Sequence, residues 1–207
     1  MTRARGAARR GRRASAPRGR GPGSIRISGG RWKGRSLEVP PAARPTSARA
    51  REALFDILGP RLAGSRWLEL YAGSGAVGLE AVSRGAVRAV LVDSDASVLA
   101  RNAARLGADR GVVRVLAADA AEGLASLERA GESFDVVFAD PPYASAAPPG
   151  LLARAASLLA ADGLLVVQTG PDAAPEIPPR LALDASRAYG RNVFWFARAG
   201  PRGTGPF

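Results

Sequence analysis

Short apolar runs alternate with longer stretches of helical periodicity from about residue 60 onward. The runs are rich in Val, Leu and Phe, which is typical of buried strands. The predicted strands are Trp67 to Tyr71, Val87 to Val92, Val112 to Leu116, Phe134 to Ala139, Leu164 to Gln168, Leu181 to Ala188 and Asn192 to Ala197. The predicted helices are Ala76 to Arg84, Ala96 to Leu106, Ala120 to Ala130 and Leu151 to Leu159.

Strands that alternate with helices at this spacing form βαβ units, and these build a mostly parallel sheet with helices on both faces. The last two strands are separated only by Tyr189-Gly190-Arg191, so we expect an antiparallel hairpin at the end of the sheet. The pattern predicts an α/β, Rossmann-like domain over residues 61–199. Ligands of such sheets bind beyond the carboxyl ends of the strands.

A different pattern precedes this domain. Apolar and polar residues alternate on either side of Gly29-Gly30, which predicts a hairpin with cationic side chains on one face. After several prolines, Thr46 or Ser47 is placed to cap a helix that ends near Leu58. Residues 25–60 are therefore expected to form a small hairpin-and-helix extension.

The positive charge is concentrated at the N-terminus. The formal net charge is +12, and residues 1–24 hold eight Arg and no acid. Residues 25–51 hold six Arg, one Lys and one Glu, while the rest of the chain has 15 Arg and 17 acids. Because residues 1–24 have little apolar surface to bury, we expect a disordered arm that attracts polyanions. Residues 200–207 are expected to form a flexible tail.

The chain has no Cys and no His. It therefore lacks thiolate nucleophiles, zinc-thiolate sites and imidazole bases, and catalysis would fall to carboxylates, Tyr, Ser, Thr or backbone groups. No apolar run approaches the ~18 residues of a membrane span, and the first 24 residues hold no apolar signal segment. We expect a cytoplasmic monomer that uses no metal and no membrane.

A glycine loop follows the first strand of the domain. Gly73-Ser74-Gly75-Ala76-Val77-Gly78 fits the G-x-G-x-x-G pattern between a strand and a helix, and Asp93 ends the next strand. This combination is typical of a site for an adenosine-containing cofactor, including a nicotinamide dinucleotide.

Acidic residues narrow the choice of cofactor. Glu69, Asp93, Asp119 and Asp140 each stand at a strand end that is predicted to face the same crevice. Several carboxylates would repel a pyrophosphate, although a helix N-terminus attracts one. They favour a cationic ligand. S-adenosylmethionine carries a sulfonium and an ammonium group without phosphate, so it fits better than a dinucleotide.

The fourth strand ends in Asp140-Pro141-Pro142-Tyr143. Two prolines fix the backbone, and they present a carboxylate, carbonyl oxygens and an aromatic ring together. The oxygens can accept the N–H groups of an exocyclic base amine, and the ring can stack on the base. Holding such an amine in line with a methyl group, at roughly 3 to 3.5 Å, promotes transfer by proximity. Neither a metal nor a covalent intermediate is required.

With these motifs the sequence resembles the RsmD family of bacterial methyltransferases, which modify the N2 amine of a guanine in 16S ribosomal RNA. The similarity spans about residues 25–198. It is carried by Arg26 to Arg35, Arg44-Pro45-Thr46, Arg51 to Phe55, Leu70 to Gly75, Gly78 to Ala81, Ser83 to Ala86 and Asp140 to Tyr143.

The resemblance implies a class I methyltransferase that depends on S-adenosylmethionine, with a seven-stranded sheet whose last strand is antiparallel. It implies that Glu69, Gly73, Ser74 and Gly75 contact the methionine end, Asp93 the ribose, and Asp119 with Ala120 the adenine. Ala72, Gly78 and Ser94 complete the predicted cofactor set. Asp140, Pro141, Pro142 and Tyr143 would hold the guanine as the catalytic group.

The implied partner is 16S ribosomal RNA or an assembling small ribosomal subunit. The residues expected to grip the RNA are Arg26, Arg31, Trp32, Lys33, Arg35, Arg44 and Arg51. From the residues alone Trp32 can equally stack on a base or cover the body. The sequence departs from the family in its long arginine-rich arm and in Gln168, where members often carry Glu.

Two other functions stay open at this point. The same tetrapeptide serves adenine-N6 methyltransferases of DNA or RNA, because that amine needs the same acceptors. A non-catalytic RNA-binding factor in ribosome assembly is the second alternative, and a nicotinamide dehydrogenase is disfavoured by the acidic crevice.

Overall fold

A computed structural model describes residues 23–41, 43, 45–142 and 147–199. The predictions for the arm (1–24) and for the tail (200–207) fall almost entirely outside these residues. The large sheet contains β3 Arg66–Leu70, β4 Arg88–Asp93, β5 Val113–Ala117, β6 Phe134–Ala139, β7 Leu159–Thr169, β8 Leu181–Tyr189 and β9 Asn192–Ala199.

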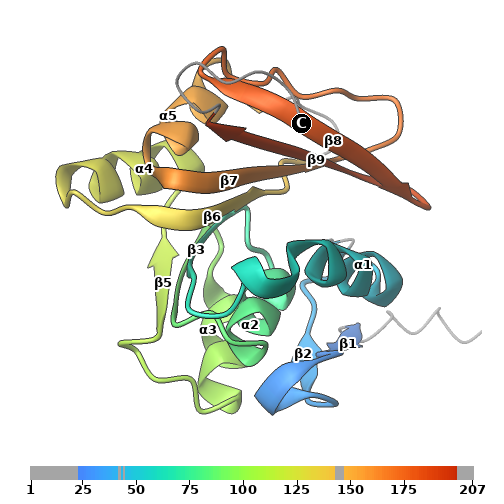
Figure 1. The fold of residues 1–207 in the computed structure, drawn as a ribbon. Helices are drawn as coiled ribbons and strands as arrows, with labels where there is room; N and C mark the ends of the chain where they lie inside the picture. The colour runs from blue at the N-terminus through green and yellow to red at the C-terminus, as the bar shows by residue number, and fades with distance from the viewer. Residues whose placement is uncertain (1–22, 42, 44, 143–146, 200–207) are drawn as a thin grey trace, which may run out of the picture.

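The seven strands lie in the order β5-β4-β3-β6-β7-β9-β8 (Figure 1). The first five of these are parallel to one another, and β9 is antiparallel to both β7 and β8. The predicted sheet and its terminal hairpin are thus confirmed. Strand order reverses between β3 and β6, so a ligand site is expected beyond the carboxyl ends of these two strands.

Helices cover both faces of the sheet, and every predicted helix agrees with the structure to within two residues at each end. The helices are α1 Ala48–Leu58, α2 Ala76–Ser83, α3 Ser97–Arg105, α4 Ala120–Arg129 and α5 Leu151–Ser157. One apolar cluster joins α1, α2 and α3 to one face, and a second joins α4 and α5 to the other. The strand β7 begins five residues earlier than predicted, because Leu159 pairs with Phe134 ahead of a bulge.

The N-terminal extension is a hairpin followed by a helix, as predicted. Its strands are β1 Ser24–Arg26 and β2 Ser36–Glu38, joined through a short 3₁₀ turn, η1 Gly30–Trp32. A second 3₁₀ turn, η2 Gly59–Arg61, follows α1. Of the two candidate caps for α1, Ser47 is the one used, and its hydroxyl accepts the N–H of Ala50 at 3.2 Å.

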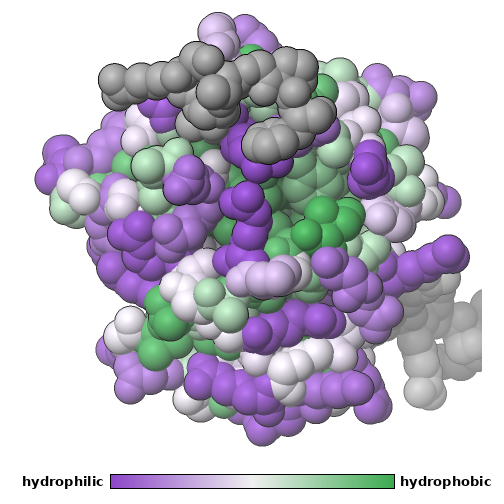
Figure 2. Space-filling model, viewed as in Figure 1, coloured by the Kyte–Doolittle hydropathy of each residue, from purple (hydrophilic) through white to green (hydrophobic). Residues whose placement is uncertain are grey.

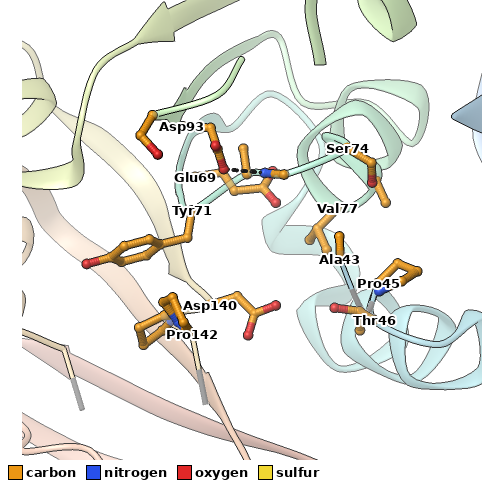
Figure 3. A pocket seen from close by; sticks show the side chains of 15 residues that line it. Ala43, Pro45, Thr46, Glu69, Tyr71, Ser74, Val77, Asp93, Asp140 and Pro142 are labelled. Atoms are coloured by element: carbon orange, nitrogen blue, oxygen red, sulfur yellow. Dashed lines mark hydrogen bonds between the residues drawn. The ribbon is translucent and has the colours of Figure 1, made fainter. Parts of the chain in front are cut away.

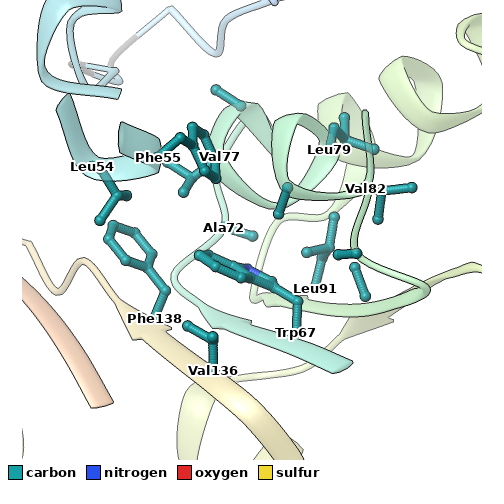
Figure 4. Packing of buried hydrophobic residues seen from close by; sticks show 14 of the residues in the cluster. Leu54, Phe55, Trp67, Ala72, Val77, Leu79, Val82, Leu91, Val136 and Phe138 are labelled. Carbon is teal, nitrogen blue, oxygen red and sulfur yellow. The ribbon is translucent and has the colours of Figure 1, made fainter. Parts of the chain in front are cut away.

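The extension shares the core of the main domain. Phe55 of α1 packs against Trp67 of β3, with ring centroids 6.2 Å apart, and Trp67 stacks on Phe138 of β6 (Figure 4). Leu54 and Leu37 belong to the same buried cluster. These contacts bring the segment before α1 to the carboxyl ends of β3 and β6.

The buried side chain of Arg51 joins the N-terminal extension to the main domain. Its side chain is 1% exposed, and Nε lies 3.1 Å from a carboxylate oxygen of Glu80 on α2. The same guanidinium donates to the carbonyl of Thr46 at 2.7 Å and to that of Arg26 at 2.6 Å. Arg84 also pairs with Glu80. One buried cation therefore joins the hairpin, the start of α1 and α2.

Candidate active site

A cavity of about 450 Å³ opens at the carboxyl ends of β3, β4 and β6. The surface seen in Figure 2 is hollowed near its centre, where hydrophobic and hydrophilic residues meet. The cavity is lined by Ala43, Pro45, Thr46, Glu69, Tyr71, Ala72, Gly73, Ser74, Ala76, Val77, Asp93, Ser94, Asp140, Pro141 and Pro142 (Figure 3). Nine of the predicted cofactor and catalytic residues are therefore together in one pocket.

The glycine loop is held by two carboxylates. Asp93 accepts the N–H of Gly73 at 2.7 Å, and Glu69 accepts the N–H of Gly78 at 2.6 Å. Gly73 has a φ of 55°, and a Cβ built there would meet no atom within 4 Å. The backbone at Gly73 is thus open to a ligand, as the motif requires.

Gly75 and Gly78 do not line the cavity, and packing explains why glycine stands at both positions. A Cβ at Gly78 would clash with the Glu69 carboxylate and with Leu91. A Cβ at Gly75 would clash with Leu99, and its φ of 75° is itself strained for other residues. Their predicted contact with the cofactor remains a prediction, while their part in shaping the loop is visible.

Glu69 is a buried acid without a cationic partner in the described part of the chain. It is 2% exposed, and burial raises its pKa to about 8, despite the N–H of Gly78. The charges of Asp140 and Asp93 push its pKa in the same direction. A cation that binds in the pocket would therefore stabilise the ionised form of the Glu69 carboxylate.

Asp140 follows β6 and directs its carboxylate into the cavity, toward the side occupied by Thr46 (Figure 3). Burial raises its pKa to about 7, and the neighbouring Gln168 side chain opposes that rise. Pro141 and Pro142 form the adjoining wall. Tyr143, the fourth residue of the tetrapeptide, lies outside the described residues.

Asp119 and Ala120 start α4 and do not line the cavity. The Asp119 carboxylate accepts the N–H of Glu122 at 2.8 Å and so caps the helix. Burial, with a further contribution from the Asp119 charge, raises the pKa of the nearby Tyr71. The cap accounts for Asp119, and its predicted contact with adenine stays untested.

Sequence reasoning missed part of the lining. Tyr71, Val77 and Ala76 adjoin the glycine loop, whereas Ala43, Pro45 and Thr46 come from the segment before α1. Tyr71 has a φ of 62°, the one positive value among described residues other than glycine. Its place between strand and loop was a usable signal, because strained residues cluster at binding sites. Nothing local in the sequence brings residues 43–46 to this pocket.

The predicted RNA contacts separate into two groups. Arg26, Arg31, Lys33 and Arg35 are exposed. Two predictions are wrong: Trp32 is 8% exposed and packs in the core, and Arg51 is bound to Glu80 instead of facing solvent. Arg31 lies over the Trp32 ring at 4.2 Å, so the ring supports a cation rather than a base. Arg44 lies outside the described residues.

In the described part of the chain, no three acidic side chains gather as metal ligands would. No helix among the same residues is long and apolar enough to cross a membrane.

The fold and the pocket define the chain as a methyltransferase of the Rossmann-like class. It belongs to the family described as Conserved hypothetical protein 95, whose model matches residues 25–198, and the resemblance to the RsmD family is confirmed. The chain is 38% identical over 190 residues to ribosomal RNA small subunit methyltransferase D of Escherichia coli (strain K12). That match covers 86% of this chain and 91% of the relative.

Solved structures agree with this assignment. The hypothetical protein TTHA0928 of Thermus thermophilus superimposes with a TM-score of 0.72 at 38% identity, covering 83% of this chain and 98% of that one. The Escherichia coli protein yhhF gives 0.70 at 35% identity, covering 86% and 98%.

Proposed function

We propose that this enzyme transfers a methyl group from S-adenosylmethionine to the N2 amine of a guanine in small-subunit ribosomal RNA. The observation that carries the proposal is that two acids in the pocket of the glycine loop, Glu69 and Asp140, have no cationic partner among the described residues. The name of the Escherichia coli relative supplies the ribosomal RNA substrate.

The pocket fits the cofactor chemically. Gly73 leaves room for close approach of the methionine end, and Asp93 at the end of β4 can accept the ribose hydroxyls. Glu69 and Asp140 add negative charge on the side where a sulfonium and an ammonium group would lie. The bound cofactor supplies an electrophilic methyl group, which needs no metal for transfer.

Asp140 and the prolines would handle the base. The Asp140 carboxylate accepts an N–H of the guanine amine and aligns the nitrogen lone pair with the methyl carbon. Transfer would join the amine nitrogen to the methyl carbon as the carbon–sulfur bond breaks, and its electron pair would stay with sulfur as a neutral thioether. The amine would lose one proton, which the deprotonated Asp140 carboxylate in the pocket could accept. A pKa of about 7 suits that role near neutral pH.

The experiment uses ribosomal particles from cells that lack this protein. Incubation with the purified enzyme and labelled S-adenosylmethionine should yield N2-methylguanosine in the digested small-subunit RNA. N6-methyladenosine as the labelled product would assign the enzyme to the adenine class. Tight cofactor binding without transfer to any particle or RNA would favour the assembly-factor alternative.

A further inference from the structure

Gln168 is a buried side chain with an unused hydrogen-bond donor next to the reactive carboxylate. It is 0% exposed, and its amide nitrogen Nε2 has no hydrogen-bond partner among the described residues. Leaving a buried N–H group unpaired costs free energy, because the group loses its hydrogen bond to water. We therefore looked for an acceptor close to the Gln168 amide N–H group.

The sheet brings that donor to Asp140. Ala139 of β6 pairs in register with Val167 of β7, so the next residues, Asp140 and Gln168, occupy neighbouring positions at the ends of parallel strands. Their side chains already interact, and this interaction favours the charged carboxylate. No hydrogen bond of normal length joins the two groups, so the amide N–H is available to strengthen this interaction.

Thr46 sets the orientation of the Gln168 amide. The Thr46 hydroxyl donates to Gln168 Oε1 at 3.0 Å, which leaves the amide nitrogen on the other side. Thr46 is 4% exposed, and its own carbonyl is held by the guanidinium of Arg51 at 2.7 Å. Arg51 is itself paired with Glu80 of α2, so this chain of contacts holds the Thr46 backbone, and with it the Thr46 hydroxyl, in place.

We propose that Thr46 and Gln168 are positioning residues for Asp140. Thr46 locks the Gln168 amide, and Gln168 aims an N–H group at the Asp140 carboxylate so that the carboxylate faces the base amine in its ionised form. This inference rests on the proposed function, and it gives the N-terminal extension a part in catalysis besides its surface cations.

The charged groups around Asp140 decide the sign of the effect. Glu69 on β3 and Asp93 on β4 face the same pocket, and both oppose ionisation of a neighbouring acid. Arg51 on α1 lies behind Thr46, with its charge paired to Glu80. The Gln168 donor therefore favours the ionised carboxylate against two acids, and removing it should raise the pKa of Asp140.

Three variants test the proposal by the pH dependence of single-turnover methyl transfer. In the parent protein the rate should fall as pH drops through about 7, where Asp140 becomes protonated. Thr46→Val and Gln168→Met should move this acidic limb upward by about half to one pH unit, which lowers the rate about 2- to 5-fold at the original midpoint. Thr46→Ser keeps the hydroxyl and should restore the parental profile. Affinity for S-adenosylmethionine should stay within about two-fold in all three.

Trp67→Phe is the matched control, because Trp67 Nε1 is the other buried N–H without a partner among the described residues. Its loss should lower the melting temperature without moving the acidic limb. An unmoved limb in folded Thr46→Val and Gln168→Met proteins would overturn the proposal.

Carbon-13 NMR titration of the labelled Asp140 carboxyl separates this inference from the proposed function. The titration needs no substrate, and the pKa should rise in both variants. A parental protein without transfer activity, but with this NMR shift in the variants, would refute the proposed function alone. An unchanged pKa would refute the positioning role whatever the activity.

Discussion

Glu80 of α2 and the two pocket acids, Glu69 and Asp140, differ in how their charges are paired. Glu80 is fully buried and faces two guanidinium groups, those of Arg51 and Arg84. Glu69 and Asp140 belong to the cavity, and no salt bridge to either is found among the described residues. Glu80 is thus paired with cationic side chains, whereas the two pocket acids are not.

The difference distinguishes a structural acid from a functional one. A buried charge is stable only when it is paired, and an unpaired carboxyl gives up its proton reluctantly. The Glu80 cluster joins the extension to α2 permanently. Burial raises the pKa values of the pocket acids to about 8 and about 7, which is what we expect of a site whose counter-charge comes from a cationic ligand.

The largest effect should follow from breaking the paired cluster. Arg51→Met leaves two carbonyls without a donor and weakens the neutralisation of Glu80, so the free energy of unfolding should fall by about 3 to 5 kcal/mol. Urea denaturation measures it. Arg49→Met, at an exposed position of the same helix, is the control and should change stability by less than about 0.5 kcal/mol. If the two variants are equally stable, then the pairing of Arg51 with Glu80 does not have the structural role that we assign to it.

The next effect concerns the unpaired acid. Glu69→Gln keeps an oxygen for the N–H of Gly78 but removes the negative charge, so affinity for S-adenosylmethionine should fall by about 10- to 100-fold, or about 1.4 to 2.7 kcal/mol.

Calorimetry in buffers of different ionisation enthalpy adds a second readout for Glu69. Because its pKa is raised to about 8, the carboxyl is mostly protonated at pH 7 in the free enzyme, and a bound cation should expel that proton. Proton release should disappear in Glu69→Gln. Unchanged affinity and proton release would show that Glu69 does not sense the cofactor's charge.

A smaller effect is expected on the pH dependence of stability. The folded-state pKa of Asp140, about 7, lies above its usual 3.8, so the folded state holds a proton that the unfolded state has lost between these values. The stabilisation from this group is complete below pH 4 and is lost as pH rises toward 7.

Asp140→Asn should therefore be more stable than the parent at pH 8, by about 1 to 3 kcal/mol, with a smaller gain at pH 5. This is less than the full shift would give, because the side chain is only partly buried. Denaturant unfolding at the two pH values measures the gain. If Asp140→Asn is less stable than the parent at pH 8, then the claim that the ionised Asp140 lacks a stabilising partner is wrong.

The smallest effect concerns the arm, residues 1–24, which carries eight Arg and no acid. RNA affinity should fall with salt by about 0.7 to 0.9 log units per log unit of salt for each phosphate contact. Removing residues 1–24 should flatten that slope if the arm engages phosphate. An unchanged slope would assign the arm no such contact.

Local patterns predicted most of the fold and the centre of the site. Alternating strands and helices gave the sheet, and the glycine loop with Asp93 and Asp140 located the pocket at the strand ends. These features are visible in sequence because each depends on neighbouring residues.

The remaining features depend on contacts between distant residues. Arg51 was expected to contact RNA, because sequence near an arginine-rich segment does not reveal its partner Glu80, 29 residues away. Likewise, Thr46 reaches Gln168 across 122 residues, a contact that neither local pattern predicts.

The most direct test of the account separates cofactor binding from methyl transfer in Asp140→Ala. Calorimetric titration with S-adenosylmethionine and single-turnover transfer to small-subunit particles should be measured on the same preparation. Binding should weaken by no more than about ten-fold, while the transfer rate falls by about a thousand-fold or more. Transfer near the parental rate, with binding intact, would contradict the claim that this carboxylate holds the amine for reaction.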